Sequence, residues 1–184
     1  MPQPTWVEYD DYGQRVALHT YRTEGTGPGY WTGTTWPASP GSGDVTTWAY
    51  DAATGLLTSK TYADSSHVDY TYKSDGRLAT RTWARGIVTT YGYNAATGDL
   101  ATIAYYDGTQ GVTYGPRDRL GRVTTVTDAV GQRTMGYDPT SLQLTSEQIP
   151  GIINRTITRT YSTSGSLLGR PKELNIGTEY ATAW

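Results

Sequence analysis

The sequence contains no cysteine and only two histidines, His19 and His67, among its 184 residues. The absence of cysteine excludes disulfide cross-links and thiolate sites, although it does not fix the compartment. A zinc site would need carboxylates to complete it, and no ligand spacing for such a site is visible. We therefore expect neither a metal ion nor any other cofactor.

Long apolar runs and an excess of basic residues are also missing. No run approaches the roughly 20 residues that a membrane-spanning helix needs. The first residues lack the basic and apolar segments of a signal peptide. With 15 Lys and Arg against 17 Asp and Glu, the net charge is −2, which leaves no basic stripe for a phosphate backbone. We expect no membrane span and no nucleic-acid partner.

Phenylalanine is absent, whereas the chain has 16 Tyr and 6 Trp. Every large aromatic side chain therefore carries an O–H or N–H group and can lie at a half-wet surface. The 33 Thr favour pleated, half-exposed strands, and the 22 Gly and 9 Pro supply turns. No segment shows sustained helical periodicity. The composition predicts thin all-β structure with much two-sided surface.

A tyrosine recurs from Tyr50 to Tyr161 at intervals of 22, 21, 21, 23 and 24 residues, and Tyr9 precedes Tyr50 by 41 residues, close to two periods. Most of these tyrosines are followed by an Asp or Asn, a Gly and an apolar residue, most completely in residues 50–57 and 93–100, whereas the copies at Tyr137 and Tyr161 are degenerate. The signature residues are Tyr9, Asp10, Gly13, Tyr50, Asp51, Gly55, Tyr72, Asp75, Gly76, Tyr93, Asn94, Gly98, Tyr114, Gly121, Tyr137, Asp138, Tyr161 and Gly165.

Each copy of the signature predicts a β-hairpin. The tyrosine ends one strand, the Asp or Asn bonds its own downstream backbone, and the glycine takes a positive φ before the return strand begins. We expect positive φ at Gly55, Gly76 and Gly98 in particular. A second turn signal falls about halfway through each period, as at Asp107-Gly108. The chain should form about 14 to 16 short antiparallel strands in a curved meander sheet.

Large side chains two residues apart precede five of the signatures. Residues two apart lie on the same face of a strand, and their repetition would stack them into a ladder across neighbouring hairpins. We predict that this ladder is the core. The pairs are Trp48 and Tyr50, Tyr70 and Tyr72, Tyr91 and Tyr93, Val112 and Tyr114, and Met135 and Tyr137.

The repeats divide the chain into four segments. Residues 1–22 form a first repeat, 23–45 a Gly/Pro-rich loop or decayed repeat, 46–170 consecutive repeats, and 171–184 the start of a further, truncated repeat. Trp31 and Trp36 lie off the period in the loop, so they are the candidates for a ligand or partner contact. Residues 180–184 carry neither charge nor proline. We expect this last strand either to mediate self-association through strand edges or to fray.

The pattern Y-D-x-x-(x)-G-x-L/V at a spacing near 21 residues resembles the RHS/YD-repeat family over about residues 6–170. Members of that family include bacterial polymorphic toxins, the shell subunits of insecticidal Tc toxin complexes and the animal teneurins. The resemblance implies a long β-sheet that spirals into a hollow shell around a C-terminal toxin or other cargo polypeptide. It also implies a secreted or cell-surface bacterial parent protein. The partners would be further repeats of the same parent chain and the enclosed cargo.

Many family members close the shell with a core segment that cleaves itself next to a D-P-x-G-type motif. Asp138-Pro139 is the nearest match in this sequence, but Thr140 and Ser141 follow without the glycine. The resemblance therefore implies a segment of shell wall without cargo or protease.

Catalytic interpretations compete with turn chemistry. Ser65, Ser66 and His67, with Asp64 and Asp69, offer a nucleophile, a base and an orienting group, but adjacent strand residues point to opposite faces. A pair of carboxylates could serve a glycosidase, yet turn chemistry explains the positions of seven of the 17: Asp10, Asp51, Asp64, Asp75, Asp107, Asp128 and Asp138. We predict a structural β-shell segment that is not an enzyme. The alternative is an adhesion or carbohydrate-binding repeat module that uses exposed Trp and Tyr side chains.

Overall fold

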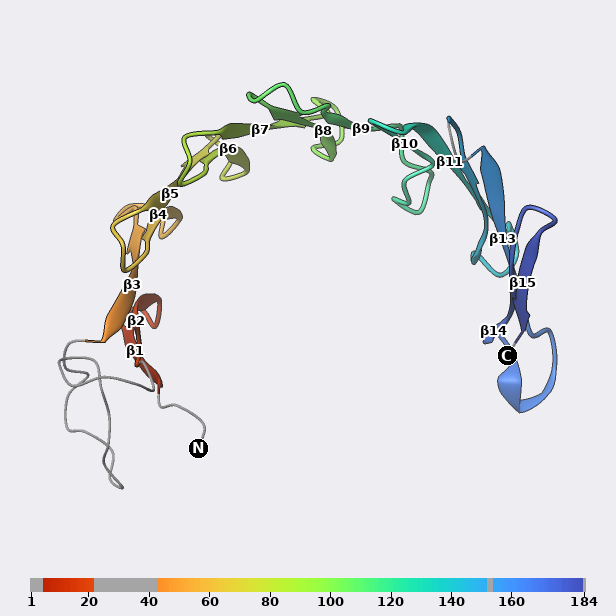
Figure 1. The fold of residues 1–184 in the computed structure, drawn as a ribbon, viewed down its shortest axis with the longest axis horizontal. Coiled ribbons are helices and arrows are strands. Elements are labelled where there is room, and N and C mark those ends of the chain that lie inside the picture. Colours follow the sequence, from red (N-terminus) through yellow and green to blue (C-terminus); the bar gives the residue numbers. More distant parts are fainter. Residues whose placement is uncertain (1–4, 22–42, 152–153, 184) are drawn as a thin grey trace. The chain divides into compact units, whose positions relative to one another are not determined.

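The structure is a computed structural model of the chain and describes residues 5–21, 43–151 and 154–183. These residues form fifteen β-strands and one short 3-10 turn, without an α-helix. The strands follow one another in the sheet in sequence order, each antiparallel to the next (Figure 1). This confirms the all-β antiparallel meander that the repeats predict. No helix in the described part of the chain is long and apolar enough to cross a membrane.

The chain divides into two compact units, Met1–Thr90 and Tyr91–Trp184. The first contains six whole strands and the beginning of a seventh. These strands are β1 (Thr5–Tyr9), β2 (Arg15–Thr20), β3 (Asp44–Tyr50), β4 (Leu57–Thr61), β5 (His67–Tyr72), β6 (Leu78–Thr82) and β7 (Val88–Tyr93). Most of the segment 23–45, including Trp31 and Trp36, lies outside the described residues.

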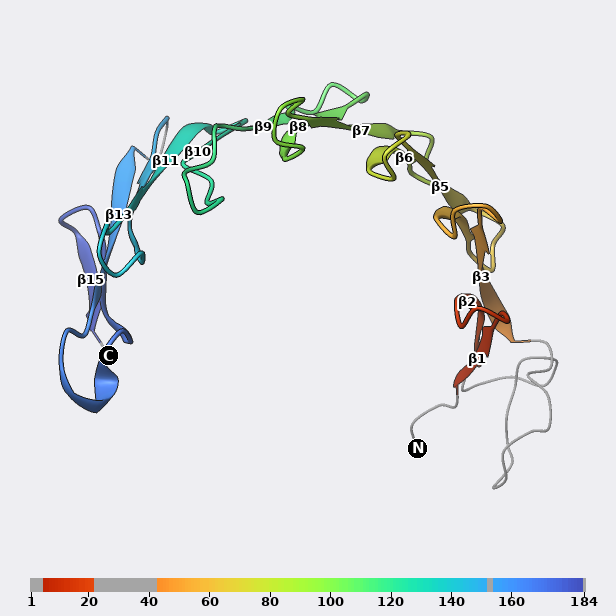
Figure 2. The same cartoon turned by 180° about the vertical axis from the view of Figure 1, so that it is seen from behind.

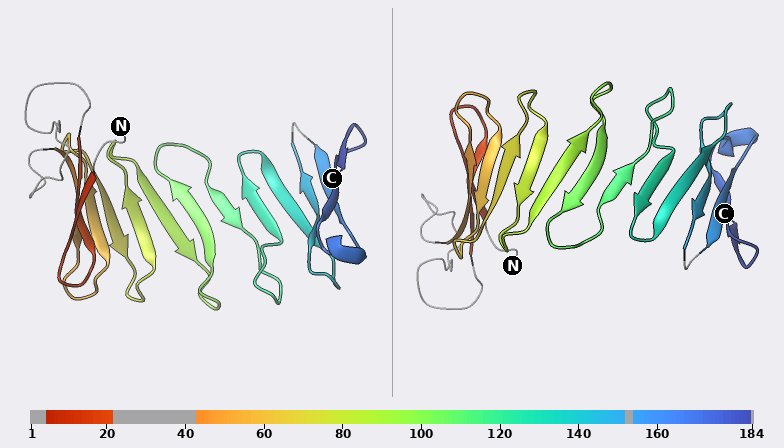
Figure 3. Two further views of the ribbon diagram at one scale, coloured as in Figure 1. Left: turned by 90° about the horizontal axis from the view of Figure 1, so that it is seen from below. Right: turned by 90° about the horizontal axis from the view of Figure 1, so that it is seen from above.

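The second unit contains the end of β7 and the remaining eight strands. They are β8 (Leu100–Tyr105), β9 (Val112–Tyr114), β10 (Thr125–Asp128), β11 (Gly131–Tyr137), β12 (Leu144–Ile149), β13 (Arg155–Tyr161), β14 (Pro171–Ile176) and β15 (Tyr180–Ala183). Successive turns alternate between the two long edges of the sheet in each unit (Figure 3). We call the turns that follow the signature tyrosines the signature turns, and those at the opposite edge the alternate turns.

The signature glycines take the backbone conformation that the turns require. Gly55, Gly76 and Gly98 have φ values of 70°, 81° and 77°, which confirms the prediction of positive φ. The last signature differs from the expected pattern. Gly165, with φ of 70°, opens the 3-10 turn, and Gly169, with φ of 76°, precedes the return strand β14. This turn is longer than the other signature turns, and its return strand begins only at Pro171.

Five signature tyrosines lie at an irregularity of their hairpin, which the sequence pattern does not predict. On the return strand the register skips one residue, as where Ala49 pairs with Ser59 but Tyr50 pairs with Leu57. Such a bulge bends the strand and redirects a side chain. The register shifts occur at Tyr9, Tyr50, Tyr72, Tyr137 and Tyr161.

The predicted ladder forms, but it is a half-buried stripe and not a closed core. Side chains of the five pairs are all partly accessible, whereas Val68 and Thr89, each 2% exposed, are the most deeply buried residues described. The reason is that no second layer of described residues covers either face of either unit's sheet (Figures 1 and 2). A lone sheet cannot enclose its apolar face.

Candidate functional surfaces of the sheet

Side-chain caps close the signature turns. In the first turn, Oδ1 of Asp10 accepts the backbone N–H groups of Tyr12 at 2.9 Å and Gln14 at 2.8 Å. An amide oxygen does the same in a later turn, where Asn94 Oδ1 accepts two downstream N–H groups. Similar caps occur at Asp51, Asp118 and Asp138.

The third signature turn is built differently. Lys73 occupies its first position, and Asp75 lies beside Gly76 near the end of the turn. The Asp75 carboxylate accepts the backbone N–H of Arg77 at 3.1 Å and also pairs with its guanidinium group. These bonds from Arg77 lower the pKa of Asp75 to about 2.

Three other signature carboxylates are also held in the ionised form. Hydrogen bonds from Thr54 lower the pKa of Asp51, and those from Arg122 lower the pKa of Asp118. The pKa of Asp138 falls because of its bonds to Ser141. A carboxylate stabilised as an acceptor in this way is a poor proton donor near neutral pH. The geometry supports a role in closing turns for these residues.

Signature tyrosines link successive hairpins through their hydroxyl groups. In each case the O–H donates to a backbone carbonyl near the start of the preceding hairpin's return strand. The four bonds are Tyr50 to Arg15 at 2.9 Å, Tyr72 to Leu57 at 2.8 Å, Tyr137 to Val123 at 2.9 Å, and Tyr161 to Leu144 at 2.8 Å. Phenylalanine could not make these bonds, which gives a structural reason for tyrosine at these four positions.

A second set of bonds joins neighbouring signature turns to each other. The donor is the residue after the left-handed residue of one turn, and the acceptor is the carbonyl of the left-handed residue in the next turn. These bonds run from Gln14 to Gly55 at 2.8 Å, from Arg122 to Leu142 at 2.6 Å, and from Gln143 to Gly169 at 2.8 Å. They hold the turns side by side along one edge of each unit's sheet.

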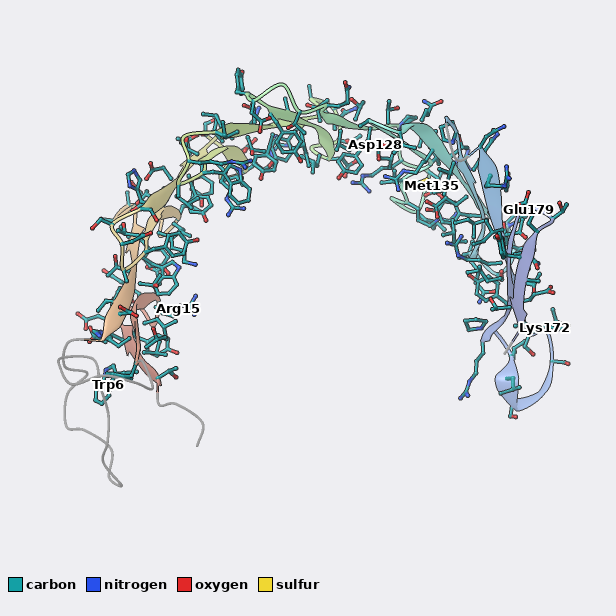
Figure 4. The ribbon with its side chains drawn as sticks, in the orientation of Figure 1. Trp6, Arg15, Asp128, Met135, Lys172 and Glu179 are labelled. Carbon is teal, nitrogen blue, oxygen red and sulfur yellow. The ribbon has the colours of Figure 1, made fainter. Side chains whose placement is uncertain are left out.

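The face that carries the predicted pairs, here called the ladder face, combines aromatic rings with cations. In the first unit, the Arg15 guanidinium lies 3.9 Å from the centre of the Trp48 ring, and Lys60 Nζ lies 5.5 Å from it. Arg81 lies 3.5 Å from the centre of the Trp83 ring. Such cation–π contacts stabilise half-exposed aromatic side chains. The view with side chains places Arg15 on this face (Figure 4).

In the second unit, a row of alternating charges crosses the ladder face from β10 to β13. Arg133 lies 2.6 Å from Asp128 and 3.7 Å from Glu147, whose other oxygen lies 3.3 Å from Arg159. Each side chain is between 18% and 34% exposed. Because each charge faces an opposite one on the neighbouring strand, the row favours this strand register.

The opposite face, here called the threonine face, carries many short hydroxyl side chains, although in β1–β3 it also carries Trp6, His19 and Val45. In the hairpin of β5 and β6, Thr71 and Thr80 face each other with their hydroxyl oxygens 2.6 Å apart. The exposed threonines of this face are Thr47, Thr71, Thr102, Thr113, Thr134, Thr156, Thr158 and Thr160. Since hydroxyl groups remain hydrated, this face suits contact with water.

Three grooves lie between consecutive signature turns. The first, of about 550 Å³, lies between turns 10–14 and 51–55 and includes Tyr12 and Trp48. The second, of about 530 Å³, lies between turns 94–99 and 118–121. The third, of about 680 Å³, lies between turns 138–143 and 162–169 and includes Leu168. Each groove also contains a signature tyrosine: Tyr50, Tyr114 or Tyr161.

The candidate triad is not assembled. The Ser66 hydroxyl donates to Asp64 at 2.6 Å, and His67 Nε2 lies 3.4 Å from Asp69. Ser66 is thus engaged with the turn and not with a base. The other histidine, His19, is 8% exposed and lies beside Glu8 at 3.0 Å. Among the described residues, no group of three or more His, Asp or Glu side chains could hold a metal ion.

The fold and its surfaces define a class of repeat protein. Hairpins of similar length follow one another in a single-layer sheet, joined through their strands and, in several cases, through a tyrosine hydroxyl or a turn-to-turn bond. In such proteins, stability is approximately a sum of terms for individual repeats and for contacts between neighbours.

Solved structures of Tc toxins contain this fold. A mutant Tc holotoxin pore from Photorhabdus luminescens matches 97% of this chain with a TM-score of 0.68 and 18% identity. TcdB2-TccC3 without its hypervariable C-terminal region matches 97% with a TM-score of 0.65 and 18% identity. The chain spans 9% and 12% of those two chains. No model of a protein family matches the sequence, and no curated protein matches it.

Proposed function

We propose that the chain is a wall segment of an RHS/YD-type β-shell that encloses or displays a toxin or another polypeptide. Its parent would be a secreted or cell-surface bacterial protein. The observation that carries the proposal is the single-layer hairpin sheet, whose fold recurs over 97% of the chain in components of Tc toxins. The repeated signature supports the same family.

The unequal faces of the sheet support a wall with an inside and an outside. The ladder face carries half-buried Tyr and Trp side chains that no described layer covers. A sheet gains stability when such a face is buried against another element. We propose that the enclosed polypeptide and further repeats of the parent chain cover the ladder face. The hydroxyl-rich threonine face would then lie toward solvent.

We also propose that the role is architectural and not enzymatic. The carboxylates that could have formed a catalytic pair accept hydrogen bonds within their own turns. The serine and histidine of the candidate triad contact different aspartates. These arrangements serve the turns, and they favour a scaffold.

Adhesion through exposed aromatic residues is the competing function. Its two candidates, Trp31 and Trp36, lie outside the described residues. Of the described tryptophans, Trp48 and Trp83 have cations over their rings, so neither offers a bare platform to a sugar. Binding on a glycan array that disappears in Trp31→Ala or Trp36→Ala would favour adhesion and contradict the shell.

Electron cryo-microscopy of the full-length gene product tests the proposal. The expected map shows residues 5–183 in the wall of a closed shell, with polypeptide density against the ladder face. A map in which solvent contacts both faces along the whole segment would contradict it. So would a reading frame that ends at residue 184.

A further inference from the structure

Exposed leucines gather in three consecutive signature turns of the second unit. These turns, 118–122, 138–143 and 162–170, lie at the same edge of that unit's sheet (Figure 3). The bonds from Arg122 to Leu142 and from Gln143 to Gly169 hold them adjacent. The leucines and their exposed fractions are Leu120 at 57%, Leu142 at 48%, Leu167 at 53% and Leu168 at 67%. We call this row the leucine edge.

Leu142 occupies a position that suits glycine. Its N–H bonds the carbonyl of Asp138 at 2.9 Å, as Gly55 bonds Asp51 and Gly98 bonds Asn94 in the equivalent turns. Its φ is 64°, a conformation that is strained for a residue with a branched apolar side chain. Strain and solvent exposure thus coincide at one leucine. Burial of the side chain against another surface would offset the free-energy cost of both.

The leucine edge also carries free positive charge. Arg119 and Arg170 are exposed, and neither side chain makes an ion pair within the described part of the chain. Arg122 is paired with Asp118. Counting formal charges over the three turns gives +1, although the whole chain carries −2. An acidic surface would therefore complement this edge.

The first unit offers such a surface at its own signature turns. Turns 10–14 and 51–55 contain three carboxylates and no basic residue, so their formal charge is −3. Tyr12 is 91% exposed beside them. The groove of about 550 Å³ between these turns is lined by Tyr12, Trp48, Ala52 and Ala53 together with Asp10 and Asp51. It has room for a leucine side chain and carries charges that suit a neighbouring arginine.

We propose that the leucine edge of one copy of this chain binds the acidic signature turns of a second copy. Both surfaces repeat once per hairpin, or about 9.6 Å for two strands, so turns on one copy can match grooves on the other. The contact joins two different surfaces and is therefore head-to-tail. It does not depend on what the sheet encloses.

Sedimentation velocity over a concentration series, at low and high salt, tests the contact. The wild-type chain should associate with rising concentration, and salt should weaken the association. Leu142→Gly should raise the dissociation constant at least about tenfold. The same variant should melt at a higher temperature, because glycine relieves the strain, so misfolding cannot explain the lost contact. Val130→Ser provides the control, since Val130 is 45% exposed but lies in an alternate turn.

Charge reversal identifies the two surfaces. Asp11 is an exposed carboxylate of turn 10–14. Asp11→Arg and Arg119→Asp should each weaken self-association, and mixing the two variants should restore it, because the reversed surfaces then match. Removal of residues 178–184 should leave this contact intact. A chain that stays monomeric at all concentrations overturns the proposal, as does unchanged association of Leu142→Gly or failure of the mixture. If a monomeric chain binds anionic phosphatidylglycerol vesicles through these leucines, the edge binds lipid, and the proposal is also overturned.

Discussion

At the scale of single residues, the hydroxyl group of the signature tyrosine is the feature that joins one hairpin to the next. Tyr72 and Tyr137 each donate to a backbone carbonyl about 15 residues earlier. Burial, and to a smaller extent the neighbouring Tyr70, raises the pKa of Tyr72. Loss of the hydroxyl would leave a part-buried carbonyl without its donor.

We expect Tyr72→Phe and Tyr137→Phe each to lower the free energy of unfolding by about 1 kcal/mol. Tyr12→Phe is the matched control, because Tyr12 is 91% exposed and should tolerate the change. Urea denaturation followed by tryptophan fluorescence and circular dichroism measures the difference. Identical midpoints for all three variants would show that the hydroxyl bonds contribute nothing.

Glycine conformation gives a second residue-scale prediction. Gly76 has φ of 81°, and a Cβ added there would meet no atom within 4 Å. Any loss of stability caused by a side chain at residue 76 would therefore come from the backbone conformation and not from steric clashes with neighbours. Gly76→Val should cost about 1–2 kcal/mol of unfolding free energy, whereas Gly76→Asn should cost much less, because Asn tolerates positive φ. Equal stability of the Val variant and the wild type in urea denaturation would contradict this.

Protonation of Asp75 gives a third prediction at the residue scale. Its pKa in the folded chain, about 2, lies below the ordinary value of 3.8. Because the pKa is lowered on folding, the bonds to Arg77 stabilise the folded chain fully above about pH 4. This stabilisation is lost as the pH falls toward 2. An NMR titration of the Asp75 carboxyl should show a midpoint near 2, and Arg77→Gln should move it back toward 3.8. A wild-type midpoint near 3.8 would rule out the pairing.

At the scale of elements, local patterns were predictable and long-range links were not. The turn at Asp51 and Gly55 is coded by a few adjacent residues, so its positive φ follows from the sequence. The bond from Tyr50 to Arg15 spans 35 residues, and Tyr50 also lies at a register shift for which the sequence carries no local signal. Lys73 at the start of its turn departs from the signature, which places an Asp or Asn there, and Asp75 accepts the downstream N–H of Arg77 instead.

The contacts of the candidate catalytic residues were also not predictable from local sequence. Ser66, His67 and Asp69 are close in the sequence, but the Ser66 hydroxyl bonds to Asp64 in its own turn, whereas His67 lies beside Asp69. The donors Gln14 and Gln143 carried no visible signal, although each follows the left-handed residue of its turn. Long polar residues at that position are a feature by which such links could be sought in sequences.

The last strand gives the element-scale prediction. Residues of β15, Tyr180–Ala183, are all exposed, and they pair on one side with β14. We expect the 184-residue chain, expressed as such, either to pair through this strand or to fray there. Hydrogen exchange of residues 180–183 should be fast in a dilute sample, and pairing should slow it as the concentration rises. Slow exchange in a strictly monomeric sample would contradict both alternatives.

At the scale of the whole molecule, the single-layer sheet is the central finding. Its order, fifteen strands in sequence, follows from hairpins alone. Curvature of the sheet stays a prediction from the repeats. The degree of burial could not be predicted from the repeats. Periodicity places Trp48 and Tyr50 on one face of the sheet, but it does not say whether another layer covers that face. In the proposed shell, that layer would come from outside the segment.

Because these 184 residues contain no cysteine, single thiols introduced into them allow a direct test of a wall with two different sides, with any cysteine elsewhere in the parent chain replaced by serine. Thr134→Cys places a thiol on the exposed threonine face, and Met135→Cys places one on the ladder face next to it. Labelling rates with a bulky maleimide are measured in the full-length gene product and, as the reference, in the isolated chain. The shell predicts that Cys at 134 reacts at similar rates in both, whereas Cys at 135 is at least about tenfold slower in the full-length protein. Equal protection at the two positions, or none at either, would contradict it.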